Sequence, residues 1–208
     1  MGDLDGDDSN CRVISKGAGV VLVSVGYRLA PQHPFPAPLD DCVTAAQWVI
    51  ANASSIGGAA GRIVLVGASA GGGLALGVAL KLIDAGKKDA VVGIVAQVPA
   101  TVHADAVPEK YKSAYRSFVE HKSDTVNTDE AMHTFWGKYF LMLLLFWERI
   151  KLIYWNIDAY GAPPTDQYAY PLRNEKLGEL PRTYVSIAGH DTLRDDGRLL
   201  ARALTENG

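Results

Sequence analysis

Residues 62–73 read Arg-Ile-Val-Leu-Val-Gly-Ala-Ser-Ala-Gly-Gly-Gly and join a short apolar run to a glycine-rich turn. The β-branched run from Ile63 to Val66 is typical of a buried strand. Beyond the glycines, apolar residues recur at helical spacing, at Leu74, Val78, Leu82 and Ala85. The stretch therefore predicts a strand, a sharp turn and a helix in direct succession.

The turn has the pattern Gly-x-Ser-x-Gly, with Ser69 at its centre. In such a strand-to-helix turn the serine backbone is strained, so small neighbours are needed to avoid clashes. The residues expected to give that clearance are Ala68, Ala70, Gly71, Gly72 and Gly73. We expect Ser69 to project at the carboxyl end of the strand as a nucleophile for a carbonyl carbon. The N–H of Ala70, at the helix N-terminus, is the predicted oxyanion donor.

The same glycines permit a second interpretation. Gly67, Gly71 and Gly73 have a spacing that can hold a dinucleotide pyrophosphate against a helix N-terminus, which would indicate an NAD(P)-dependent dehydrogenase. Short-chain dehydrogenases also resemble one another in a Tyr-x-x-x-Lys pair, and none of the 9 tyrosines here has a lysine four residues later. The motif also follows an earlier predicted strand and helix. Dinucleotide binding is therefore the less favoured alternative.

Strands and helices alternate along the rest of the chain. Apolar runs typical of strands occupy residues 19–25, 91–98 and 183–188. Helical periods cover residues 39–50 and begin again at 200–204. This alternation predicts an α/β fold, with a mostly parallel sheet covered by helices on both faces.

The composition is that of one globular domain spanning residues 1–208. Hydrophobic residues make up 48% and charged residues 21%, which excludes intrinsic disorder. The net charge of −3 gives no basic surplus, so neither nucleic acid nor a membrane surface is an expected partner. The acidic N-terminus is unlike a signal peptide, so we expect a cytoplasmic protein. The composition leaves the oligomeric state open.

Residues 100–160 are predicted to form a cap or insert. Residues 141–155 within them do not fit the alternation of strands and helices seen in the rest of the chain. This segment holds 12 apolar residues out of 15, yet it is shorter than the about 20 residues that a membrane span needs. One interpretation is a buried helix or part of a substrate-covering cap. The other hypothesis is that residues 141–155 are not part of the native fold, for example a translated intron.

Four motifs, taken together, resemble a known family. Residues 23–37 read Val-Ser-Val-Gly-Tyr-Arg-Leu-Ala-Pro-Gln-His-Pro-Phe-Pro-Ala, and residues 40–42 read Asp-Asp-Cys. With the Gly-Ala-Ser-Ala-Gly-Gly of residues 67–72 and the Gly-His-Asp-Thr-Leu-Arg-Asp-Asp-Gly of residues 189–197, they resemble the hormone-sensitive-lipase-like branch of the α/β-hydrolases. The resemblance implies an α/β-hydrolase fold and a serine carboxylic ester hydrolase of the esterase or lipase type. It implies a small-molecule ester substrate and no cofactor.

The resemblance also implies the roles of the site residues. Ser69 would attack the ester carbonyl, a histidine would carry its proton to the leaving alcohol, and Asp191 would orient that imidazole. The family keeps this histidine beyond the aspartate, but none of the residues after Asp191 is histidine. Its His-Gly-Gly-Gly oxyanion run, which precedes a stretch resembling the first residues here, is also missing. We therefore expect a domain incomplete at both ends, with little or no turnover.

A non-catalytic protein that binds a small ligand is the alternative from another class, because the gibberellin receptor resembles the same family without hydrolysing its ligand. None of the histidines is a favoured substitute base; they are His33, His103, His121, His133 and His190. Their spacing indicates no metal site. Cys11 and Cys42 are expected to be buried reduced thiols. Asp195 and Asp196 are expected to begin the last helix.

Overall fold

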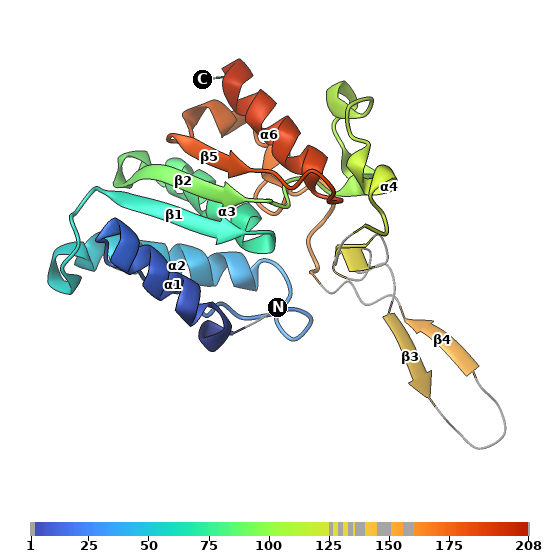
Figure 1. Ribbon diagram of the computed structural model, residues 1–208, viewed down its shortest axis with the longest axis horizontal. Coiled ribbons are helices and arrows are strands. Elements are labelled where there is room, and N and C mark those ends of the chain that lie inside the picture. The colour runs from blue at the N-terminus through green and yellow to red at the C-terminus, as the bar shows by residue number, and fades with distance from the viewer. Residues whose placement is uncertain are drawn as a thin grey trace.

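The structure is a computed structural model that describes residues 3–124, 127–128, 131–132, 135, 140–144, 151–155 and 160–207. Its centre is a parallel three-stranded sheet in the order β1-β2-β5 (Figure 1). The strands are β1 (Ile63–Ala68), β2 (Val91–Gln97) and β5 (Thr183–Ser186). Three of the four predicted strands are therefore confirmed.

The register of the sheet sets where the candidate site lies. Ala68 pairs with Gln97, and Gln97 pairs in turn with Ser186, so all three strands end together. Because the strands are parallel, the turns that follow them leave from this single edge of the sheet. Ser69 and Asp191 both follow strands that end there.

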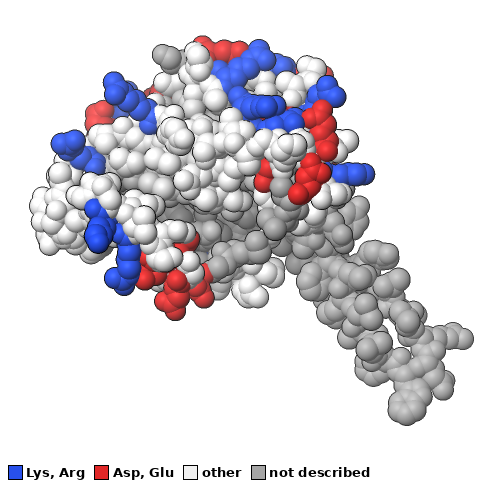
Figure 2. All heavy atoms as spheres, viewed as in Figure 1, with Lys and Arg blue, Asp and Glu red and all other residues white. Residues whose placement is uncertain are grey.

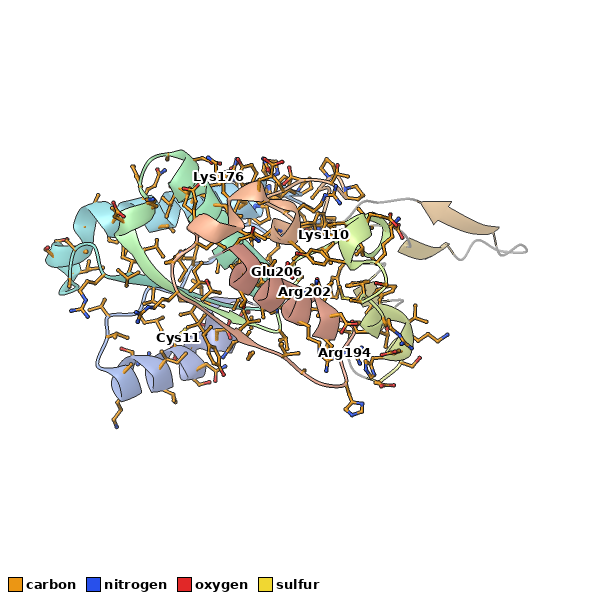
Figure 3. The ribbon with its side chains drawn as sticks, turned by 90° about the horizontal axis from the view of Figure 1, so that it is seen from above. Cys11, Lys110, Lys176, Arg194, Arg202 and Glu206 are labelled. Atoms are coloured by element: carbon orange, nitrogen blue, oxygen red, sulfur yellow. The ribbon has the colours of Figure 1, made fainter. Side chains whose placement is uncertain are left out.

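The main helices are α1 (Leu4–Ala18), α2 (Ala37–Asn52), α3 (Ala70–Asp84) and α6 (Arg194–Asn207), with the short α4 (Ser117–Glu120). The 3-10 helices are η1 (Ala53–Ile56), η2 (Lys88–Ala90), η3 (Ala104–Ala106), η4 (Glu109–Tyr111), η5 (Pro171–Arg173) and η6 (Glu175–Glu179). Helix α3 packs on β1, β2 and α2, while α1 lies across the sheet from α2 (Figures 1 and 3). The predicted α/β fold, a parallel sheet covered by helices, is confirmed. No helix in the described part of the chain is long and apolar enough to cross a bilayer.

Helix α3 forms the centre of the core because it is apolar on all sides. Leu76, Leu80 and Leu82 on this helix are each at most 1% exposed. Leu76 and Leu82 belong to a cluster that also holds Leu39 of α2 and Ile94 of β2. A helix buried on every face is held by packing rather than by an amphipathic stripe. This packing fixes the N-terminus of α3 at the carboxyl edge of the sheet.

The strand predicted at residues 19–25 is wrong. Residues 20–29 have no helix or strand, and the exposed valines there are Val20, Val21, Val23 and Val25. Helix α1, which we did not predict, ends at Gly19, whose φ of 64° is the left-handed conformation that terminates helices. In the described residues no strand lies beside this run. A β-branched sequence without a neighbouring strand has no ladder to join.

The buried helix considered for residues 141–155 is also wrong. Within the described residues of this segment the backbone forms strands β3 (Phe140–Leu144) and β4 (Lys151–Trp155), paired antiparallel with Phe140 opposite Trp155. Figure 1 shows this pair projecting away from the central sheet. Leucine, isoleucine and aromatic residues suit a strand as well as a buried helix, so a short apolar run does not distinguish the two.

Candidate functional site

Ser69 lies at the turn between β1 and α3 in a strained backbone conformation, with φ 53° and ψ −119°. Hydrogen bonds on both sides hold it there. The Ser69 N–H donates to Gln97 O at 2.9 Å, and Ser69 O accepts from the N–H of Ala100 and of Gly73, each at 3.2 Å. These bonds tie the turn to the end of β2 and to the first turn of α3. Neighbouring structure that over-determines a residue can sustain such strain.

The clearance around Ser69 comes from two glycines. A Cβ on Gly67 would lie 2.1 Å from Gly71 O, and one on Gly73 would lie 2.4 Å from Ala100 O. Neither position can hold a side chain without moving backbone. A Cβ on Gly71 would meet no atom within 4 Å, so the expectation that Gly71 supplies clearance is wrong. The required small residues are Gly67 near the end of β1 and Gly73 in the first turn of α3, because another backbone segment lies against each of them.

The half-buried Ser69 is followed by the exposed Ala70, the first residue of α3. The first N–H groups of a helix have no intrahelical acceptor, and the helix dipole makes this end electropositive. Of the hydrogen bonds among the described residues, none uses the Ser69 hydroxyl. A nucleophile and an oxyanion donor can therefore act at this turn, and both roles stay predictions.

Asp191 lies in the turn that joins β5 to α6 and is 7% exposed. Its Oδ1 accepts from the Leu193 N–H at 2.8 Å, and its Oδ2 accepts from the Asn127 side-chain amide at 3.1 Å. No imidazole among the described residues is hydrogen-bonded to this carboxylate. Asp191 thus follows β5 at the edge of the sheet where a triad acid is expected, but the side chain bound to its carboxylate is the Asn127 amide.

Of the five histidines considered as bases, two are hydrogen-bonded to other residues, two are exposed, and His133 lies outside the described residues. His103 is 3% exposed, and its Nδ1 accepts from the Asp105 N–H at 3.2 Å. His33 is exposed before α2. His121 Nδ1 lies 2.7 Å from Asp124 Oδ2, and the His190 side chain is 86% exposed. The turn after β5 thus carries Asp191 inward and His190 outward.

Asp195 and Asp196 begin α6 as predicted, but both are buried and bind backbone from distant segments. Asp195 accepts from the N–H groups of Arg116 at 2.8 Å and Ser117 at 2.7 Å. Burial alone would raise its pKa, but the hydrogen bonds from Arg194 and these two amides outweigh burial and lower the pKa to about 2. Two carboxylates on α6 therefore hold the segment that follows β2, a role that their spacing did not reveal.

Asp196 makes the second of these anchors. It accepts from the Thr101 N–H at 2.8 Å, the Val102 N–H at 3.1 Å and the Tyr115 hydroxyl at 3.1 Å. Burial raises the pKa of Asp196 to about 7, although these hydrogen bonds favour the carboxylate. This group titrates near neutral pH at a junction between α6 and the segment after β2.

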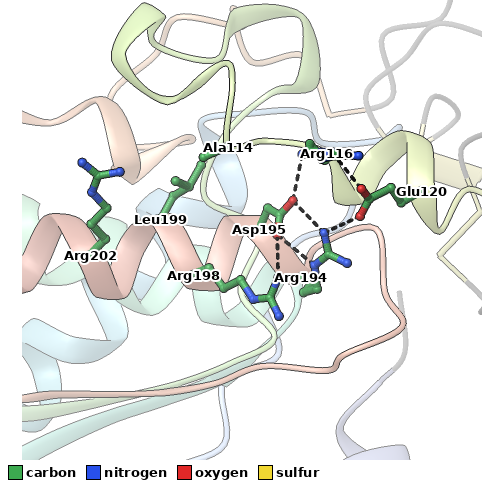
Figure 4. Close-up of a pocket in the computed structure, with 8 residues that line it drawn as sticks. All are labelled: Ala114, Arg116, Glu120, Arg194, Asp195, Arg198, Leu199 and Arg202. Atoms are coloured by element: carbon green, nitrogen blue, oxygen red, sulfur yellow. Dashed lines mark hydrogen bonds and ion pairs between the residues drawn. The ribbon is translucent and has the colours of Figure 1, made fainter.

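A hollow of about 500 Å³ lies on the outer side of α6, and neither Ser69 nor Asp191 lines it. Figure 2 shows lysine and arginine side chains gathered over this side of the molecule. In Figure 4 the Arg194 guanidinium reaches both Asp195 and Glu120, at 2.9 and 2.7 Å. The guanidinium groups of this hollow are thus largely neutralised by neighbouring carboxylates.

Both thiols are free, but they are half-buried rather than buried as expected. Cys42 lies on α2, where burial and the nearby Asp41 carboxylate raise its pKa to about 11. Cys11 lines a separate hollow between α1 and the run that includes Leu22 and Ser24. A raised pKa keeps the Cys42 thiol protonated, so it is a poor nucleophile at neutral pH.

The family model of the alpha/beta hydrolase fold matches residues 1–144 and 142–208. The chain is 42% identical over 208 residues to an FAD-linked oxidoreductase of Aspergillus terreus, which it covers by 23%. It is 41% identical over 204 residues, 98% of its length, to the versiconal hemiacetal acetate esterase of Aspergillus parasiticus, which it covers by 57%.

The solved structures agree. The esterase of the archaeon Pyrobaculum calidifontis superposes with a TM-score of 0.79 at 32% identity, over 100% of this chain and 60% of that one. Apart from the oxidoreductase, the chain spans somewhat more than half the length of these relatives. Carboxylic ester hydrolases recur among the relatives. The matched motifs, the parallel sheet and the strand-turn-helix around Ser69 show that the chain belongs to the alpha/beta hydrolase fold family, in its hormone-sensitive-lipase-like branch.

Proposed function

We propose that this chain is the core of a serine carboxylic ester hydrolase in which Ser69 is the nucleophile. The observation that carries the proposal is the Ser69 backbone at φ 53°, held between β1 and α3 by three hydrogen bonds. Strain at one residue inside an otherwise regular strand-turn-helix is typical of a functional position. The esterases among the relatives support a carboxylic ester as the substrate class.

The proposed reaction begins when Ser69 Oγ attacks the ester carbonyl carbon as a base removes the hydroxyl proton. The carbonyl oxygen becomes an oxyanion, and the Ala70 N–H donates to it at the N-terminus of α3. The C–O bond to the alcohol then breaks and the alcohol leaves with the proton, so that an acyl-serine remains. Water hydrolyses that ester and regenerates the Ser69 hydroxyl.

Asp191 is proposed to orient the imidazole that acts as base, since it is fixed by Leu193 at the same edge of the sheet as Ser69. In the described residues its carboxylate is bound by the Asn127 amide instead. An amide accepts no proton from a serine, so we propose that these 208 residues turn over esters slowly. In other serine hydrolases, loss of a triad member leaves only the residual rate from binding and the oxyanion hole.

Ester hydrolysis with added imidazole tests this proposal. Imidazole can act as the base from solution, so p-nitrophenyl acetate hydrolysis is expected to rise with imidazole more steeply for the wild-type chain than for Ser69→Ala. The Ser69→Ala rate corrects for hydrolysis by imidazole alone. A longer protein that provides the histidine is expected to be faster still without imidazole. Equal rates for wild type and Ser69→Ala at every imidazole concentration contradict the proposal.

A non-catalytic small-ligand-binding protein is the second candidate, and the amide partner of Asp191 is the observation that favours it. The two candidates differ in what happens to a bound ester. A binding protein would hold a p-nitrophenyl ester without forming an acyl-serine, with or without imidazole. Detection of the acetylated Ser69 peptide by mass spectrometry after quenching at acidic pH supports the enzyme, whereas saturable binding without that adduct supports the binding protein.

A further inference from the structure

We propose that His121, Asp124 and His190 form a binding site for a divalent transition-metal ion of the Zn²⁺ type. Their ligand atoms all lie within 4.8 Å of one another. His121 and Asp124 flank the turn after α4, while His190 belongs to the turn after β5. Histidine spacing along the chain did not reveal this group, because one ligand lies far from the other two in sequence.

The distances between these atoms suit a bound ion. His121 Nδ1 lies 2.7 Å from Asp124 Oδ2, and His190 Nδ1 lies 3.8 Å from the same oxygen. Two ligands about 2 Å from a tetrahedral Zn²⁺ are separated by about 3.3 Å. The two observed distances lie on either side of this value, so small rotations of the side chains bring all three ligands to the ion.

Backbone hydrogen bonds hold the first two ligands at a fixed spacing. The His121 N–H donates to Ser117 O at 2.9 Å, and the Asp124 N–H donates to His121 O at 3.2 Å. The His121 and His190 rings then meet edge to face, with centroids 5.3 Å apart. His121 is 12% exposed, whereas Asp124 and His190 are open to solvent at 42% and 86%. An ion can therefore enter from the side of His190 and keep water as its remaining ligand.

Arg194 selects the ring tautomer of His121 before an ion binds. Its guanidinium contacts His121 Nε2 and can only donate, so Nε2 holds the lone pair and the Nδ1 hydrogen points at Asp124. Binding of an ion to Nδ1 would require this hydrogen on Nε2, and the Arg194 guanidinium, which is one rigid plane, would then have to shift as a whole away from His121.

The chemistry of the donor set favours Zn²⁺ or a similar ion over Mg²⁺ or Ca²⁺. Two imidazole nitrogens and one carboxylate oxygen form the three-ligand set of many zinc sites that keep an open position, whereas Mg²⁺ and Ca²⁺ select oxygen ligands. The site joins the turn that carries Asp191 to the turn after α4. A bound ion would therefore brace these two segments against each other, whether or not Ser69 reacts with esters.

Titration of the untagged 208-residue chain with Zn²⁺, followed by calorimetry, tests the proposal. One ion per chain is expected, and Co²⁺ in its place is expected to give visible absorption bands of a low-symmetry site. His190→Gln and Asp124→Asn are each expected to weaken Zn²⁺ binding by at least about tenfold. The exposed ligand His190 makes the decisive variant, because its replacement disturbs little packing.

Three controls separate this site from other sources of binding. His33→Gln removes an exposed histidine elsewhere and is expected to bind as wild type. Ser69→Ala is expected to bind as wild type too, so a failure of the ester hydrolase proposal leaves this result intact. Cys11→Ser tests the thiol on α1, which lies well apart from Arg194 in Figure 3. The proposal is overturned if wild type shows no saturable binding, if His190→Gln binds as tightly as wild type, or if Cys11→Ser abolishes binding.

Discussion

The runs at residues 20–25 and 63–68 are both rich in valine and leucine, the first more so than the second, yet only the second forms a strand. The two runs differ in whether another strand lies next to them. Strand β1 has β2 along one side, with Gly67 opposite Ala96, whereas the first run has no strand partner among the described residues. The two runs together teach that β-branched sequence makes a strand possible and a neighbouring strand makes it form.

Strand β1 is hydrogen-bonded to a neighbouring strand along one edge only, the edge that faces β2. It lies at the end of the sheet order, and its outward side chains Val64 and Val66 are 50% and 48% exposed. Val21 in the unpaired run is 49% exposed. Elsewhere β1 is fixed by packing under α3. The end of β1 that leads into the turn at Ser69 should therefore tolerate little change, and its open edge should tolerate much more.

The largest effect is expected where β1 passes under α3. Gly67→Ala places a methyl group 2.1 Å from Gly71 O and 2.3 Å from its carbonyl carbon, so the backbone must move. We expect a loss of about 3 to 5 kcal/mol in the free energy of unfolding. Gly71→Ala is the matched control, since its Cβ meets no atom within 4 Å. Measured by urea unfolding, the free energy of unfolding of Gly71→Ala should lie within about 1 kcal/mol of wild type. Equal losses in both variants would contradict the packing argument.

A smaller effect is expected at Asp196, which joins α6 to the segment after β2. Because its pKa rises to about 7 on folding, from an ordinary value of 3.8, the folded state holds a proton that the unfolded state releases. Its contribution to stability is thus present below pH 4 and is lost as the pH rises through about 7. Asp195 and Asp41, with pKa values lowered to about 2, lose theirs only as the pH falls below about 4.

The Asp196→Asn variant isolates this group, since the amide oxygen still accepts from Thr101 and Val102. Between pH 4 and 7.5 we expect the free energy of unfolding of wild type to fall, relative to the variant, by at least about 1 kcal/mol. Chemical unfolding at several pH values measures the difference. Parallel pH profiles for the two proteins would show that Asp196 does not titrate on folding in this range.

A still smaller effect on stability is expected at the open edge of β1. Val66→Lys puts a charge on a half-exposed side chain, where it should change the free energy of unfolding by less than about 1 kcal/mol. Charged edge residues oppose strand pairing between molecules, so light scattering at high concentration should grow more slowly. Val13→Lys, at a 71% exposed position on α1, is the control and should leave the scattering unchanged.

The smallest effect is expected from removing residues 141–155, which we propose are not part of the native fold. Strands β3 and β4 pair with each other and not with the central sheet. The deleted chain should unfold within about 1 kcal/mol of the whole chain, because the core around α3 is untouched. A much larger loss, or retention of these codons in the dominant mature transcript, would show that the segment belongs to the protein.

Local sequence predicted the part of the fold in which consecutive residues make the decisive contacts. The strand, turn and helix from Ile63 to Asp84 follow from apolar spacing and from the Gly-x-Ser-x-Gly pattern, although the pattern did not identify Gly67 as a glycine that the turn requires. The motif order likewise placed Asp191 after the strand β5. The run at residues 20–25 failed the same reasoning because its outcome depended on a neighbour distant in sequence.

The rest depended on contacts across the chain. Asp196 carries no sequence signal that it will meet Thr101, and His190 gives no sign that it will meet Asp124. These pairs form only once β2 and β5 lie side by side and α6 packs over them. Burial and hydrogen bonds, rather than residue type, determine the roles of the Asp196 and Asp124 carboxylates. Pairing at such a distance is visible only in the folded chain.

Labelling of Ser69 tests the central claim most directly. The chain is incubated with a fluorophosphonate ester in the presence of imidazole, digested and mapped by mass spectrometry, with Ser69→Ala treated in parallel. If the turn between β1 and α3 presents a nucleophile, the phosphonyl adduct forms on the peptide that contains Ser69 and accumulates faster as imidazole increases. Absence of that adduct, or equal labelling of the Ser69→Ala chain, would contradict the assignment of Ser69 as the nucleophile.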